Sequence, residues 1–282
     1  MTIRPDALLS HDFGKTPHAY APRDAILYAL GIGLGRDPLD ETDLAFMDET
    51  DLSVLPTYAV TLASPGMWMR DPRFGIDFAR LVHMAQEAWF ESPLPPAGRI
   101  IGTARVHSVS DRGVGKGAVM VVERRIADAQ SGALHCRLHQ TLLLRGDGGF
   151  GGPPPAHPTG FDYATEPGQR TSFATSPRSA LIYRLSGDWN PLHLKPDFAA
   201  RAGFERPILH GLASYGIAGW AVSRALGMDP QALSRLACRF SGIVTPGDTI
   251  DFAIWHENGK AHFRAFVNER KVLDGGTAEW RH

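Results

Sequence analysis

Three polar side chains that could do acid–base chemistry lie within six residues of one another. Asp188, Asn190 and His193 belong to the stretch GDWNPLH. Because Pro191 breaks a helix, these groups lie on a turn or loop, which can aim a carboxylate, an amide and an imidazole at one point. Carboxyl and imidazole groups have ordinary pKa values of about 4 and about 6.5, so one can be ionised while the other exchanges protons near neutrality. Addition of water to a double bond requires this combination.

Spacing alone leaves a structural alternative open. Asp, Asn and His are also common as turn and helix-capping residues, and Asp188, Asn190 and His193 could serve only that purpose. A metal site is disfavoured, because no further histidine or carboxylate falls at ligand spacing around them. We therefore expect no bound metal.

A loop rich in glycine and proline divides the chain into two parts of similar size. Residues 145–160 read RGDGGFGGPPPAHPTG, which cannot form the interior of a helix or strand, and the loop continues more loosely to about residue 172. The expected organisation is a first unit over residues 1–150, a linker over 151–172 and a second unit over 173–282.

Both parts carry strand patterns. In the first, residues 99–109, 117–126 and 134–144 are expected strands, and 75–90 is either a long strand or a strand entered from a helix. In the second, the expected strands are 238–244, 250–256, 261–267 and 272–280. An Asn-Gly turn at 258–259 predicts a hairpin between two of them.

One long helix is expected ahead of the second set of strands. The stretch GLASYGIAGWAVSRAL at residues 211–226 is apolar on nearly every face, which is typical of a buried helix. We infer a helix wrapped by a strongly curved antiparallel sheet, an arrangement present twice.

The balance of charged residues and the cysteine content indicate which partners and which cellular compartment to expect. The chain has 29 basic and 30 acidic residues, a net charge of -1, and no long run of one sign, so neither nucleic acid nor a membrane surface is an expected partner. Cys136 and Cys238 read as reduced core residues. The start of the chain has no apolar run typical of a signal peptide, and no stretch is long enough for a membrane span, so we expect a cytoplasmic protein.

Several motifs resemble one family of enzymes. GDWNPLH at 187–193, followed by PILHGL at 207–212, is similar to the signature of the MaoC-like hydratases, most of all to the hydratase-2 domains. The resemblance continues over nearly the whole chain, at YALGIG (28–33), SVLPT (53–57), LPPAG (94–98), GGFGG (148–152), RF (239–240) and PGDT (246–249).

The resemblance implies a fold, a reaction and a set of residues. The fold is α+β, a double hot-dog in which two antiparallel sheets each wrap a central helix, and such chains pair as homodimers. The reaction is the reversible (R)-specific hydration of a trans-2-enoyl-CoA, with a CoA thioester as substrate and no cofactor. Asp188 and His193 correspond to the family's catalytic pair and Asn190 to its motif asparagine. The backbone N–H of Gly211 corresponds to its oxyanion donor.

Further expectations concern substrate binding. The first half contains no second GDxNPxH, so we expect one active site per chain, with the first half holding the acyl group. His83 and Gln86 fall where the family reads His-Gly-Glu-Gln, and Ala85 replaces its glutamate. We expect this position to border the acyl pocket. The basic side chains near the motif, Lys195, Arg206 and His210, are candidate CoA contacts.

Two other functions remain as alternatives. A hot-dog thioesterase would hydrolyse the acyl-CoA, but it does not need this Asp-x-Asn-Pro-x-His loop. A non-catalytic acyl-thioester binding protein is favoured only by Ala85. A monomer, in which the internal repeat suffices, is the alternative to the homodimer.

Overall fold

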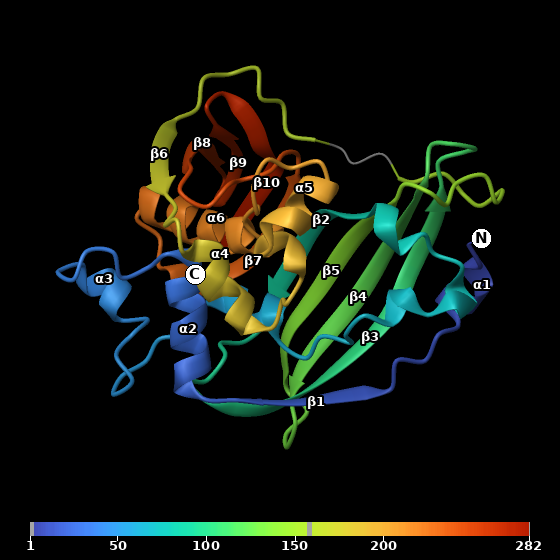
Figure 1. Ribbon diagram of the computed structural model, residues 1–282. Helices are drawn as coiled ribbons and strands as arrows, with labels where there is room; N and C mark the ends of the chain where they lie inside the picture. Colours follow the sequence, from blue (N-terminus) through green and yellow to red (C-terminus); the bar gives the residue numbers. More distant parts are fainter. Residues whose placement is uncertain (1–2, 157–159, 282) are drawn as a thin grey trace.

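A single antiparallel sheet of ten strands forms the frame of the protein (Figure 1). The computed structural model describes residues 3–156 and 160–281. The sheet order is β1-β3-β4-β5-β2-β7-β10-β9-β8-β6. The strands are β1 Lys15–Tyr20, β2 Leu81–Phe90, β3 Gly98–Asp111, β4 Ala118–Asp128, β5 Leu134–Leu144, β6 Gln169–Ala174, β7 Leu233–Phe240, β8 Thr249–Glu257, β9 Lys260–Val267 and β10 Arg270–Trp280.

The sheet consists of the same unit twice. Read from its outer edge inward, the first half has the order β1-β3-β4-β5-β2 and the second β6-β8-β9-β10-β7, so each strand has a counterpart five numbers later. The halves join where β2 pairs antiparallel with β7, from Ala85 opposite Arg239 to Trp89 opposite Arg235. The predicted repeat of antiparallel strands is confirmed, although the two expected sheets are joined edge to edge.

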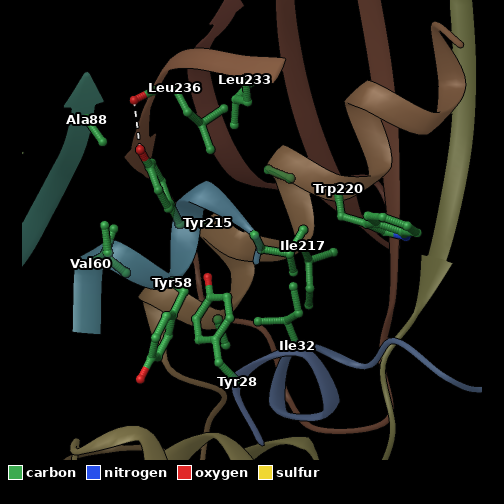
Figure 2. Close-up of a cluster of buried hydrophobic side chains, with 14 of the residues drawn as sticks. Tyr28, Ile32, Tyr58, Val60, Ala88, Tyr215, Ile217, Trp220, Leu233 and Leu236 are labelled. Atoms are coloured by element: carbon green, nitrogen blue, oxygen red, sulfur yellow. Dashed lines mark hydrogen bonds between the residues drawn. The ribbon is translucent and has the colours of Figure 1, made fainter. Parts of the chain in front are cut away.

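The predicted buried helix is α6, Gly211–Ala225, and the strands of the second half wrap around it (Figure 1). Glycine, alanine and serine allow close approach on some faces, while Tyr215, Ile217 and Trp220 fill the space on others (Figure 2). The buried hydroxyl of Tyr215 donates to the Leu236 carbonyl at 2.8 Å. The helix is thereby tied to β7, the strand at the junction of the halves.

Among the described residues the first half has no equivalent helix, so the central helix expected in both halves is present only in the second. Between β1 and β2 the chain forms α2 (Pro22–Ile32), α3 (Glu41–Leu44) and four short 3₁₀ turns, η1 (Pro56–Thr61), η2 (Trp68–Arg70), η3 (Pro72–Phe74) and η4 (Phe78–Arg80). The 11-residue α2 packs against α4 and α6 of the other half. Prolines stand at the first position of α2, η1 and η3, where they start a short helix without removing one of its hydrogen bonds.

The remaining elements lie at the start of the chain and around the motif. They are α1 (Pro5–Leu9), α4 (Ser179–Tyr183), η5 (Arg184–Ser186), η6 (Pro191–His193), α5 (Pro196–Arg201) and η7 (Pro230–Ala232). No described helix is both long and apolar enough to cross a membrane. Cys136 and Cys238 are free and buried, as predicted.

Two predicted element boundaries differ from those in the structure. The strand predicted over 238–244 is β7, which starts at Leu233 and ends at Phe240. The expected linker over 151–172 reaches into β6, which begins at Gln169. Residues 157–159 of that linker lie outside the described residues.

Candidate active site

The motif loop is shaped by its own polar side chains. The 3₁₀ turn η5 ends at Gly187, whose φ of 112° favours glycine. The carboxylate of Asp188 then accepts the backbone N–H of Asn190 at 3.2 Å, and the Asn190 side-chain oxygen accepts the N–H of Leu192 at 3.1 Å. The side chain of Asn190 therefore caps the following 3₁₀ turn, as the alternative of a turn and capping residue predicts. Asp188 remains exposed, so its carboxylate is also free to meet a ligand.

His193 is held in one tautomer. Its side chain is buried, and Nδ1–H donates to the Ile208 carbonyl at 2.8 Å, since a carbonyl can only accept. The other nitrogen, Nε2, therefore carries the lone pair. Burial lowers the pKa of His193, which keeps the ring neutral near pH 7. The geometry defines a neutral imidazole with Nε2 ready to accept a proton.

His210 completes a cluster that the sequence spacing does not reveal. Its ring stacks on His193 with 3.7 Å between centroids, and its Nε2–H donates to the Asp188 backbone carbonyl at 3.3 Å. Ligand-type atoms of Asp188, His193 and His210 all lie within 4.8 Å of one another. The expectation that no third donor accompanies Asp188 and His193 is thus wrong, because folding brings in a residue 17 positions beyond His193.

The environment of His210 differs from that of a surface CoA contact. It is only 1% exposed, and burial, followed by the neighbouring His193, lowers its pKa to about 3. His210 is thus held neutral, in contact with the His193 ring and the Asp188 backbone carbonyl.

Gly211 begins α6 directly after His210. The first N–H groups of a helix have no partner inside it and carry the positive end of its dipole. The nearest atoms that a Cβ added to Gly211 would meet are those of the Phe240 ring, at 3.4 Å, so the ring lies directly beside the helix start.

The first half contributes His83 to the same region. The ring of His83 on β2 packs edge-on against Phe240, with 4.9 Å between centroids, and Phe240 is the neighbour of Gly211. Burial lowers the pKa of His83 to about 4. The hydrogen bond to the Ala85 carbonyl and the negative charge of Asp188 act in the opposite direction and raise it. Gln86 is 4% exposed, and its side-chain amide donates to the Glu87 carbonyl at 3.2 Å.

Ala85 points away from this site, which corrects the expectation that it borders the acyl pocket. It pairs with Thr141 on β5 and Arg239 on β7, and directly paired residues share a face of the sheet. Gln86 is on the opposite, inner face. A bulge between His83 and Ala85 places His83 opposite the buried Leu142 and thus on the inner face too.

Lys195 and Arg206 are exposed in the segments that flank α5. Neither forms a side-chain hydrogen bond or ion pair with the Asp188–His193–His210 cluster among the described residues. Trp189, also in the motif, is 58% exposed, with the Arg184 guanidinium 4.5 Å from its ring centroid. Lys195 and Arg206 are therefore exposed residues outside the cluster.

Buried neutral histidines predict acid sensitivity. The pKa values of His83 and His210 are lowered by burial to about 4 and about 3, against an ordinary 6.5, and that of His193 is also lowered. Below pH 6.5 the unfolded chain binds more protons than the folded one, so the free energy of unfolding falls as the pH drops. We expect the melting temperature to decline between pH 7 and pH 5, less steeply in His210→Asn. A flat profile over that interval would contradict the neutral state of these rings.

Position 85 gives a second prediction. Because its side chain faces Arg239 on the outer side of the sheet, Ala85→Glu should leave kcat and KM for short enoyl-CoAs within about twofold, as expected of surface substitutions. Steady-state kinetics of the purified variant measure this. A tenfold change in either constant would mean that the position does reach the reaction.

Comparisons with known proteins agree with this geometry. Residues 161–275 match the model of the MaoC like domain, and residues 18–146 match the MFE-2 hydratase 2 N-terminal domain. The chain is 40% identical over 275 residues to 3-hydroxyacyl-thioester dehydratase Y of Mycobacterium tuberculosis, covering 93% of both chains.

Solved structures show the same architecture. A MaoC-like dehydratase from Phytophthora capsici superposes with a TM-score of 0.85 at 32% identity, covering 98% of each chain. A Mycobacterium tuberculosis protein described as a double hotdog fold gives a TM-score of 0.57 at 13% identity, covering 100% of this chain and 97% of that one, and so supports the fold alone. Fold and site thus define a double hot-dog protein of the dehydratase class. The chain belongs to the MaoC-like dehydratase family, with a first half of the hydratase 2 type.

Proposed function

We propose that the protein hydrates trans-2-enoyl-CoA thioesters to (R)-3-hydroxyacyl-CoA, and that it catalyses the reverse dehydration. One observation carries the proposal. The bond from His193 Nδ1–H to the Ile208 carbonyl leaves Nε2 as the basic nitrogen. A ring nitrogen of His193 lies within 4.8 Å of an Asp188 carboxylate oxygen, and the ring of His193 stacks on the residue before Gly211. A base, a carboxylate and a helix start are together what hydration of a conjugated thioester needs.

The reaction follows from these positions. A water molecule held by the Asp188 carboxylate gives a proton to His193 Nε2 as its oxygen bonds to C3 of the enoyl group. The π electrons move to the thioester oxygen, where the Gly211 N–H at the start of α6 stabilises the negative charge. The enolate then collapses and C2 takes the proton back from His193. One water molecule is consumed, and no cofactor is required.

Other residues bind and orient in this proposal. Asn190 holds the loop by accepting the Leu192 N–H. His83 and Gln86 face the acyl side from β2, since both lie on its inner face. Lys195 and Arg206, which are exposed on either side of α5, contact the phosphates of CoA as cations do.

The proposal is tested by mixing the purified protein with crotonyl-CoA while following both the absorbance of the conjugated thioester and free thiol. Hydration lowers the absorbance and releases no thiol. Thiol release would instead identify a thioesterase, and binding without either signal would identify a carrier of acyl thioesters. Either of these two results would contradict the proposal.

We also propose a cytoplasmic homodimer. Two free, buried cysteines are typical of reducing compartments. The sheet ends in the outer strands β1 and β6, whose edges are open to pairing or must be covered, and twofold pairs are the commonest assembly of soluble proteins. Light scattering behind a sizing column should give about twice the chain mass of 30.7 kDa. A mass near that of one chain would refute the dimer.

A further inference from the structure

The inner face of the first-half sheet is interrupted by polar side chains. One hydrophobic cluster there includes Ile126 and Leu138, and another includes Val122 and Leu142. Between the two clusters lie Arg124 on β4 and Gln140 on β5. His83 and Gln86 continue the same polar band across β2 toward the catalytic loop. We call these four residues the polar band: Arg124, Gln140, Gln86 and His83.

Register places Arg124 on the inner face. It alternates with Glu123 and Arg125, which are on the outer face, and it stands opposite Leu138, a residue of the core. Its Nη2 donates to the carbonyl of Val60, another core residue, at 2.6 Å. The guanidinium is therefore inside the first half.

Among the residues that the structure describes, the charge of Arg124 has no anionic partner. Its Nε is buried without a hydrogen-bond acceptor, and no described carboxylate pairs with it or stabilises its charge. Burial lowers the pKa of Arg124 to about 10, so the side chain stays protonated near pH 7. Arg124 is half-buried as a residue, and its guanidinium has a single carbonyl partner. A charge withdrawn from water in this way is costly unless it is paired. The missing partner points to a ligand that carries one.

A second buried polar group lies beside the catalytic loop. Tyr183 is 1% exposed, its hydroxyl has no hydrogen-bond partner among the described residues, and its ring lies 4.9 Å from that of His210. The charges of Asp188 and Arg124 both act on it. Arg124 is on the second strand from β2, so roughly 10 Å separates its strand from the one that carries His83. An acyl chain of medium length spans such a distance.

We propose that Arg124 binds a carboxylate at the far end of the acyl group, so that the preferred substrates are enoyl-CoAs derived from dicarboxylic acids. The inference rests on the proposed function, because it assumes an acyl chain attached at the catalytic loop. A carboxylate is the partner of choice, since a guanidinium offers it paired donors and an opposite charge. The unpartnered Tyr183 hydroxyl and the amides of Gln86 and Gln140 provide further polar contacts along the way.

The test compares two substrates of equal length, trans-2-octenoyl-CoA and its analogue with a terminal carboxylate. Hydrogen bonds to charged groups contribute enough to change affinity by about 10- to 100-fold. The wild-type protein should therefore have a kcat/KM at least about tenfold higher for the carboxylate. Arg124→Met should reverse this preference, and Arg124→Lys should keep part of it. The matched control is Arg125→Met, since Arg125 is the exposed neighbour on the outer face, and it should keep the wild-type ratio.

Two results would overturn the proposal. One is a wild-type kcat/KM that is higher for the alkyl substrate than for the carboxylate. This measurement uses the wild-type protein alone, so it decides the question even if Arg124→Met does not fold. The other is a folded Arg124→Met protein with an unchanged ratio of the two kcat/KM values. Failure of the wild-type protein to hydrate crotonyl-CoA would instead remove the proposed function itself, so the two failures are distinguishable.

Discussion

Asp188→Asn and His193→Gln should each lower turnover of an enoyl-CoA by about 100- to 10,000-fold, the range typical of general acid–base groups. Asparagine keeps the size of Asp188 and its bond to the Asn190 N–H but removes the charge that holds the water. Glutamine at position 193 removes Nε2, the only ring nitrogen of His193 that is free to accept a proton.

Controls separate chemistry from folding. Asp197→Asn removes an exposed carboxylate of α5, and His256→Gln removes an exposed imidazole at the end of β8. Both should retain wild-type kcat, and all four variants should keep the wild-type circular dichroism. A near-normal rate in a folded variant of Asp188 or His193 would exclude that residue from the mechanism.

The second large effect is stereochemical. If the thioester oxygen lies at the Gly211 N–H, the plane of the enoyl group is fixed, and water reaches it only from the side of Asp188 and His193. The product is then a single enantiomer, and the resemblance to the hydratase-2 proteins assigns it as (R). Coupling to an (S)-specific 3-hydroxyacyl-CoA dehydrogenase should give no NADH, whereas an (R)-specific enzyme should give a full signal. Strong NADH formation with the (S)-specific enzyme would contradict the assignment.

The sequence was sufficient for features set by local pattern. The apolar and small residues of 211–226 predict a buried helix, and α6 is that helix. Alternation and turn residues predict eight of the ten strands, all but β1 and β6, closely enough to reveal the repeat, because period-two patterning is a property of each strand alone. The polar loop around Asp188 and His193 was also evident, since proline and glycine fix its type.

Features that depend on contacts between distant parts of the chain could not be predicted from local sequence pattern. His210 joins Asp188 and His193 only because the chain returns along the start of α6, and no spacing rule signals that return. The face occupied by Ala85 depends on a bulge in β2, which shifts every later side chain by one position. The helix expected in the first half was inferred from the repeat and not from a local apolar pattern, and the segment before β2 forms α2, α3 and four short 3₁₀ turns instead.

Hydration in water labelled with oxygen-18 tests the central claim most directly. Crotonyl-CoA is incubated with the protein in labelled water, and the product is analysed by mass spectrometry with fragmentation. We predict an intact CoA thioester that has gained one water molecule, with the label in the hydroxyl group on C3. Label in the carboxylate of a free acid, or an unlabelled and unchanged thioester, would contradict a hydratase.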